Sequence, residues 1–148
     1  MTTTKTNKKK HGNRILKFKP FVRFARKNDL PDEALIEASD EIEKGLVEAD
    51  LGGGVFKKRI ARAGEGKSGG YRAIVFFKAG DKTFFVHIFA KSDEDNISPK
   101  ELKDFKKLAG VVLRMREDEI KKQIKSGYLT EVKRDEKENK SENKEVSK

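Results

Sequence analysis

The chain lacks cysteine, long apolar runs and a second histidine outside its N-terminal segment. Without cysteine it has no disulfide framework, no thiolate metal site and no cysteine nucleophile. Its longest unbroken apolar run, residues 73–77, is far shorter than the roughly 18 residues that a membrane helix needs. No apolar segment follows the basic N-terminus, which therefore does not resemble a secretory signal. These absences predict a cytoplasmic protein without a membrane partner.

Apolar residues are also scarce at both ends of the chain, where residues 1–14 and 133–148 contain one each, Met1 and Val146. Segments this polar cannot bury enough apolar surface to fold. We therefore expect a disordered basic arm over 1–14 and a disordered charged tail over 133–148. Between them, residues 15–132 have the ordinary globular share of apolar side chains, and we expect one domain there.

Charge is plentiful but unevenly distributed. The chain has 35 Lys and Arg against 25 Asp and Glu, a formal net charge of +10. Residues 57–91 contain nine basic and two acidic residues, whereas residues 31–50 contain eight acidic residues and one basic residue. Such segregation predicts one strongly positive surface, which favours a polyanionic partner such as nucleic acid.

The apolar pattern predicts a meander of three strands. These strands cover residues 55–61, 71–78 and 83–91. The short glycine-containing connections between them, including a glycine-rich loop over 62–70, indicate antiparallel pairing. Residues 15–18 are a candidate first strand, and residues 21–24 either extend it or form a helical turn.

Helical patterns flank this meander. Apolar residues recur at helical spacing from an N-cap at Asp29 to Gly45, with acidic residues on the outer face. Ser98 and Glu101 form a capping box that begins a second helix. A shorter helical stretch over 117–125 and a candidate last strand over 128–132 complete the pattern. The expected fold class is α+β, a compact antiparallel sheet packed against helices.

Several motifs that suggest chemistry are incomplete. Residues 64–68 resemble part of a phosphate-binding loop, but Ala61 replaces its first glycine and the loop leads into a strand, so we expect no NTPase. His87 lies alone in its strand, on the face of Phe85 and Phe89, without a second histidine or a carboxylate cluster. We therefore expect no metal site and no cofactor.

Four cations form the most informative group. Strand alternation puts Lys57 and Arg59 on one face, Arg72 begins the adjacent strand, and Lys91 ends the third. Three neighbouring strands would each offer a cation near one sheet surface. This pattern is typical either of a phosphate-binding surface or of a solvated basic face. Lys67, in the glycine-rich loop, is either a plain turn residue or a basic finger that touches a nucleic-acid backbone.

The order of these motifs along the chain is also informative. The stretch from Glu48 to Arg62, the sequence Gly-Lys-Ser-Gly-Gly-Tyr-Arg at 66–72, and residues 89–92 and 95–98 together resemble a RelE-type toxin of a bacterial type II toxin–antitoxin system. The resemblance covers about residues 18–132. It is to a branch with the Gly-Lys-Ser-Gly-Gly-Tyr-Arg signature, and the combined spacing of the motifs is specific to that branch. It implies a compact antiparallel sheet packed by helices and a cognate antitoxin as partner.

The resemblance also implies an activity, the metal-free endoribonuclease cleavage of mRNA in the ribosomal A site. In this reaction the 2′-hydroxyl attacks the adjacent phosphate, which calls for a base, an acid and cations that stabilise the phosphorane. The family's catalytic cations correspond to Lys57, Arg59, Arg72 and Lys91. Neighbouring RNA contacts are expected at Lys58, Arg62, Lys67 and Tyr71. For acid–base work near the C-terminus, Tyr128 is a remote candidate.

Two other functions fit the same pattern. ParE-like toxins have the same fold and inhibit DNA gyrase by binding, without cutting RNA, and fold alone does not separate them from nucleases. The cluster of Lys57, Arg59 and Arg72 favours the nuclease. The third possibility is a non-catalytic nucleic-acid-binding domain with the same positive surface.

Overall fold

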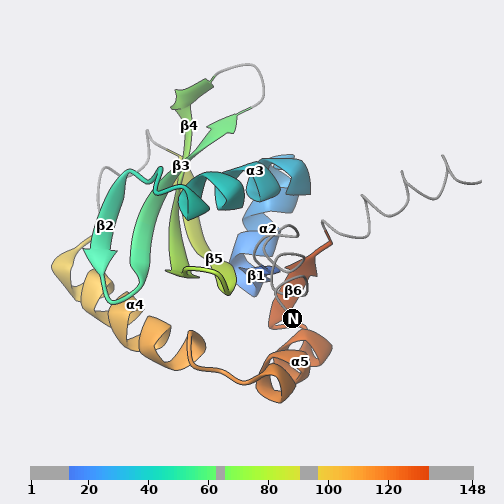
Figure 1. Cartoon of the computed structure of the whole chain (residues 1–148). Coiled ribbons are helices and arrows are strands. Elements are labelled where there is room, and N and C mark those ends of the chain that lie inside the picture. The colour runs from blue at the N-terminus through green and yellow to red at the C-terminus, as the bar shows by residue number, and fades with distance from the viewer. Residues whose placement is uncertain (1–13, 63–65, 91–96, 134–148) are drawn as a thin grey trace, which may run out of the picture.

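The computed structural model describes residues 14–62, 66–90 and 97–133, with the backbone alone for Arg62 and residues 66–69. These residues form a six-stranded sheet and four helices (Figure 1). Across the sheet the strands follow the order β2 (Ala49–Gly52), β3 (Val55–Arg62), β4 (Gly66–Lys78), β5 (Lys82–Ala90), β1 (Arg14–Phe18) and β6 (Leu129–Val132). The α+β class expected from the sequence is confirmed.

The central meander is confirmed, because β3, β4 and β5 are neighbours and pair antiparallel. The predicted loop over 62–70 is wrong for its second half. β4 begins at Gly66, which pairs with Arg62 of β3. Pairing with β3 thus extends the strand through glycines whose intrinsic strand propensity is low.

The order of the outer strands is not visible in the sequence pattern. β1 runs parallel to β5, with Ile15 opposite Thr83, and antiparallel to β6, with Leu16 opposite Glu131. The sheet is therefore mostly antiparallel, with one parallel pair inside it. β2, which the sequence pattern did not predict, pairs with β3 and forms the opposite edge.

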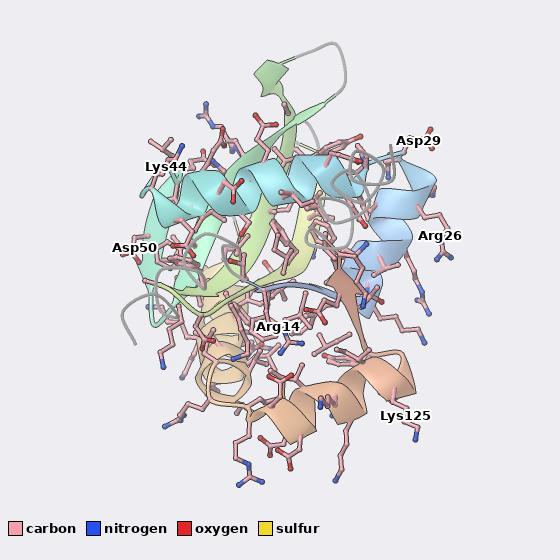
Figure 2. All side chains as sticks on the ribbon, turned by 45° about the vertical axis from the view of Figure 1, so that its right-hand side comes forward. Arg14, Arg26, Asp29, Lys44, Asp50 and Lys125 are labelled. Atoms are coloured by element: carbon pink, nitrogen blue, oxygen red, sulfur yellow. The ribbon has the colours of Figure 1, made fainter. Side chains whose placement is uncertain are left out.

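Helices cover the sheet on both faces. The helices α2 (Lys19–Lys27) and α3 (Asp32–Glu43) pack with Phe85 and Ile60 into one core. The helices α4 (Pro99–Val112) and α5 (Glu117–Ser126) pack with Phe76 and Phe84 into the other. In Figure 2, α3 crosses in front of the sheet, with Asp29 near one end and Lys44 near the other. Successive residues of the central strands thus face different helix layers.

Of the two predicted N-caps, one is confirmed and one is wrong. The capping box is confirmed, since Ser98 Oγ accepts from the Glu101 amide at 3.1 Å and Glu101 Oε1 accepts from the Ser98 amide at 2.9 Å. Asp29, however, is not the N-cap of α3, which begins after Pro31. Asp29 has a φ of 55°, a left-handed turn conformation that Asp tolerates better than most residues, and lies in the turn between α2 and α3.

Arg14 anchors the start of the described chain. Its guanidinium donates to Glu131 of β6 at 2.9 and 3.1 Å and to Glu117 of α5 at 2.6 Å. The hydrogen bond to Glu131 is the main cause of the raised pKa of Arg14. β1 therefore starts one residue before the expected domain boundary.

The rest of the expected arm, 1–13, and residues 134–148 of the expected tail lie outside the described residues. Within the described chain, every helix is too short or too polar to span a membrane.

The capping box should contribute measurably to the free energy of unfolding. Ser98→Ala removes the acceptor for the Glu101 amide, so we expect the free energy of unfolding to fall by about 1 kcal/mol in urea denaturation at neutral pH. The exposed Lys103→Ala in the same helix is the control and should change it by less than about 0.5 kcal/mol.

The Glu101 half of the box should depend on pH. The hydrogen bond from the Ser98 amide is the largest cause of the lowered pKa of Glu101. The contribution of the Glu101 carboxylate to the free energy of unfolding is therefore complete above the ordinary Glu pKa. It is lost as the pH falls through the lowered pKa. Equal effects of Ser98→Ala and Lys103→Ala at neutral pH would contradict the capping role.

Candidate functional site

β3 carries three consecutive cations, and the pleat of the strand divides them between the two helix layers. Lys57 and Arg59 lie on the face of Val55, which belongs to the core beneath α4 and α5. Lys58 lies on the face of Ile60, which belongs to the core beneath α2 and α3. The residue Lys57 is 8% exposed and Lys58 is 4% exposed, so both are largely buried.

Arg72 of β4 joins Lys57 and Arg59 on the α4 side of the sheet. The register places Arg72 directly opposite Arg59 and places Ile74 directly opposite Lys57. Directly opposed residues of an antiparallel pair share a face, with Cβ atoms about 4.5–5.5 Å apart. The structure thus brings together Lys57, Arg59 and Arg72, which we call the cation cluster.

A carboxylate lies between the two arginines of this cluster. Glu48 Oε2 is 3.1 Å from Arg72 Nη2 and 3.5 Å from Arg59 Nη2. The Glu48 amide donates to the carbonyl oxygen of Lys57 at 2.8 Å, which fixes the segment before β2 against β3. The sequence places Glu48 in the stretch that resembles the family but does not assign it a role. The signal was an acidic residue shortly before a basic strand, but its partners depend on strand pairing.

His87 lies on the same face as the cation cluster because β5 contains a bulge. Ile74 pairs with His87 and Val75 pairs with Phe85, so Val86 is the extra residue. The expected shared face with Phe85 is wrong, since Phe85 packs into the α2 and α3 core. The shared face with Phe89 is confirmed by their ring distance of 5.6 Å.

The His87 imidazole packs against α4, with its ring 6.0 Å from the ring of Phe105. Because Arg72 pairs with Phe89, His87 is the diagonal neighbour of Arg72, at a typical Cβ distance of about 7–8 Å. Bulges commonly redirect a side chain near an active site. The sequence showed the histidine but not the bulge that places it on the sheet face of Arg72.

Two predicted RNA contacts lie in the opposite layer. Lys58 Nζ donates to the carbonyl oxygen of Leu46 at 2.7 Å and is 2.7 Å from Glu41 Oε1. Tyr71 is 3% exposed and its ring makes an edge contact with Phe24 of α2. Both side chains are part of the packing beneath α2 and α3, and we leave them out of the proposed site.

The other expected site residues are placed as follows. The side chains of Arg62 and Lys67 and the whole of Lys91 lie outside the described residues. Tyr128 is exposed at the start of β6, where its ring packs on Phe18. In the order of strands, β5 and β1 separate β6 from β4, and β4 lies between them and β3, so Tyr128 is far from the cation cluster.

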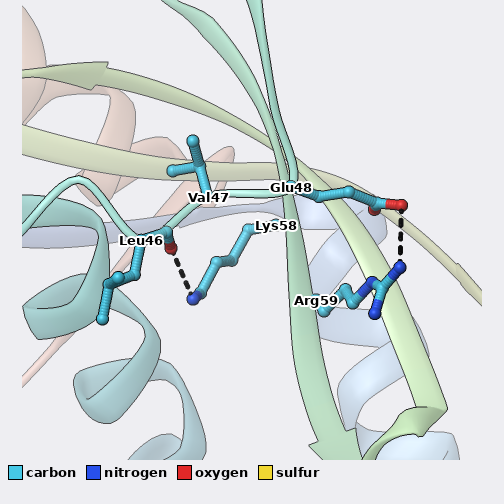
Figure 3. A pocket seen from close by; sticks show the side chains of 5 residues that line it. All are labelled: Leu46, Val47, Glu48, Lys58 and Arg59. Atoms are coloured by element: carbon cyan, nitrogen blue, oxygen red, sulfur yellow. Dashed lines mark hydrogen bonds and ion pairs between the residues drawn. The ribbon is translucent and has the colours of Figure 1, made fainter.

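A hollow of about 350 Å³ opens beside Arg59 (Figure 3). It is lined by Leu46, Val47, Glu48, Lys58 and Arg59. Figure 3 shows Lys58 directed toward Leu46 while Glu48 and Arg59 meet on the other side of β3. A group entering this hollow would meet an apolar edge, a guanidinium and a carboxylate. No group of three or more His, Cys, Asp or Glu able to hold a metal is found among the residues that the structure describes.

A second basic surface lies on α2, which packs on the opposite face of the sheet from the cation cluster. The helix contains no acidic residue, and four cations recur on one side of it. They are Lys19, Arg23, Arg26 and Lys27. All four are exposed, and none makes an ion pair within the described part of the chain. Arg26 points away from the sheet in Figure 2. The i, i+4, i+7, i+8 spacing was visible in the sequence once the segment was known to be helical.

The buried pair of Lys58 and Glu41 yields a prediction for stability. Glu41→Ala leaves an uncompensated buried ammonium and should cost about 3–5 kcal/mol of the free energy of unfolding. The double variant Lys58→Met/Glu41→Leu should recover most of this loss, because apolar side chains replace the pair without leaving a charge. Urea denaturation measures both. If the double variant folds but binds single-stranded RNA more weakly than the wild type, Lys58 contacts RNA and belongs to the proposed site.

Comparison with known proteins identifies the family. No curated protein and no solved structure gave a significant match. A family model described as the RelE toxin of the RelE/RelB toxin-antitoxin system matches residues 13–132. The match spans every helix and strand described above, together with the cation cluster, Glu48 and His87. The chain therefore belongs to the RelE toxin family.

Proposed function

We propose that this toxin is a metal-independent endoribonuclease that cuts mRNA in the ribosomal A site and so stops translation. The observation that carries the proposal is the placement of Lys57, Arg59 and Arg72 on one sheet face, with His87 beside Arg72. Family membership supports a toxin whose partner is a cognate RelB-type antitoxin. The site of action, ribosome-bound message, is cytoplasmic.

The reaction requires charge stabilisation at phosphorus and proton transfer at two oxygens. The 2′-hydroxyl gives its proton to a solvent water and attacks the adjacent phosphorus, the bond from phosphorus to the 5′-oxygen breaks, and a 2′,3′-cyclic phosphate is left. Arg59, Arg72 and Lys57 stabilise the negative charge that develops on the phosphorane oxygens. His87 gives a proton to the departing 5′-oxygen.

The basic surface of α2 supports a large RNA partner. Exposed cations without ion pairs attract phosphates at long range and release counterions on binding. In this proposal the cation cluster acts on one phosphodiester, whereas Arg23, Arg26 and Lys27 contact the backbone of structured RNA.

The direct test is controlled expression in a bacterial host with mapping of mRNA 5′ ends. Cuts in phase with codons support the nuclease. Intact message with DNA damage would support a ParE-like gyrase inhibitor instead. Intact message without DNA damage, together with RNA binding by the purified chain, would support a non-catalytic nucleic-acid-binding domain.

Arg72→Lys tests the role of the guanidinium. Lysine keeps the charge but lacks the planar fork that holds a phosphate through two hydrogen bonds. We expect cleavage of ribosome-bound mRNA to slow by about 10²–10³-fold, the usual cost of losing one transition-state donor. Arg116→Lys, at the exposed start of α5, is the matched control and should keep the wild-type rate. An unchanged rate for Arg72→Lys would remove Arg72 from the reaction.

His87→Ala tests proton donation to the leaving group. We expect about 10²–10⁴-fold slower cleavage of an ordinary phosphodiester. A substrate with sulfur in place of the bridging 5′-oxygen needs no such proton, because a thiolate is a good leaving group. The variant should therefore cut this substrate at nearly the wild-type rate, whereas Arg72→Lys should stay slow on both substrates. Equal losses for His87→Ala on the two substrates would exclude His87 as the acid.

A further inference from the structure

The two arginines of the cation cluster, Arg59 and Arg72, would repel each other without a third group between them. They lie directly opposite each other in the antiparallel pair of β3 and β4. Like charges in this arrangement repel each other and destabilise the pairing. The side chain of Arg72 is only 13% exposed, so water screens its charge poorly. An anion between the two guanidiniums is therefore needed to keep them close together.

Glu48 supplies that anion from outside the two strands. One of its oxygens, Oε2, is near Nη2 of both arginines, at 3.1 and 3.5 Å. Its other oxygen, Oε1, is buried and has no hydrogen-bond partner among the described residues. A purely structural ion pair would gain more from a bidentate contact with a single arginine. The observed contact satisfies the carboxylate less well but fixes two guanidiniums relative to each other.

We propose that Glu48 is a positioning residue, which orients Arg59 and Arg72 toward a phosphodiester and lowers the anion affinity of the cluster. This inference rests on the proposed function, since it concerns the same site. The side chain of Arg59 is 44% exposed, so its guanidinium can meet a phosphate from the solvent side while it contacts Glu48. The negative charge of Glu48 offsets one of the three positive charges of the cation cluster. Glu48 therefore orients the two arginines but weakens the binding of RNA to the cation cluster.

The variant Glu48→Gln separates the two effects. Without the carboxylate charge, the cluster should bind RNA more tightly, and the slope of log K against log salt should steepen by up to about 0.7, the value for one further charge on a single strand. The arginines lose their fixed geometry, so kcat should fall by up to about 10²-fold. Tighter binding with slower cleavage is a combination that loss of stability does not produce.

Glu48→Asp is the second variant. It keeps the charge but is one methylene shorter, so the carboxylate withdraws from at least one guanidinium. We expect kcat to fall while the RNA affinity and the salt slope stay at wild-type values. Glu41→Gln is the matched control, because it removes a carboxylate that pairs with a β3 cation in the opposite helix layer. Once corrected for the folded fraction, its kcat, affinity and salt slope should equal those of the wild type.

Two measurements keep this inference distinct from the proposed function. Binding is measured with a fluorescent, fully 2′-O-methylated RNA that has no nucleophile, and cleavage is measured with ribosome-bound mRNA. A wild-type chain that binds but never cuts would overturn the nuclease, while an altered salt slope in Glu48→Gln would still support control of the cluster charge by Glu48. A Glu48→Gln variant with the affinity, salt slope and corrected kcat of Glu41→Gln would overturn the role of Glu48, even with an active wild type.

Discussion

Three consecutive cations in a strand that is covered on both faces constrain the whole structure. Lys57, Lys58 and Arg59 cannot all reach water, because β3 lies between α3 on one side and α4 on the other. A buried charge needs an opposite charge and hydrogen bonds close by. The protein meets this need with Glu41 from α3 for Lys58, while Glu48 from the segment before β2 pairs with the largely buried Arg72 and also with Arg59, whose side chain is 44% exposed. Both carboxylates come from the acidic stretch that precedes the strand.

This arrangement changes the meaning of the charge segregation in the sequence. Eight acidic residues in 31–50 and nine basic residues in 57–91 suggested separate surfaces of opposite sign. The fold instead packs α3 and the segment after it against β3, so part of the positive charge is neutralised inside the molecule. The unpaired cations of α2 then become a larger share of the exposed positive charge.

The two layers also separate the residues of the proposed site from residues that stabilise the fold. On the side of α2 and α3, Lys58 and Tyr71 are held by packing, an ion pair and a backbone carbonyl. On the side of α4, the pairing of β3, β4 and β5 brings the cation cluster and His87 onto one sheet face. One bulge in β5 places His87 on this face. Adjacent residues of one strand can thus have unrelated tasks, because the period of the strand is two. The RelE family match fits this division without assigning a reaction to any residue.

The sequence by itself determined the α+β class, the three-stranded meander, the capping box at Ser98 and the shared face of Lys57 and Arg59. Each of these depends on local spacing, which the chain carries in its residue order. Only the tertiary structure decided that β1 lies between β5 and β6, that β4 extends to Gly66, and that His87 lies on the sheet face of Arg72. Only it brought Glu48 between Arg59 and Arg72, and Glu41 against Lys58. The physical reason is that strand order, a bulge and the partner of a buried charge depend on contacts between distant segments, and these form only when the sheet and its two helix layers are assembled.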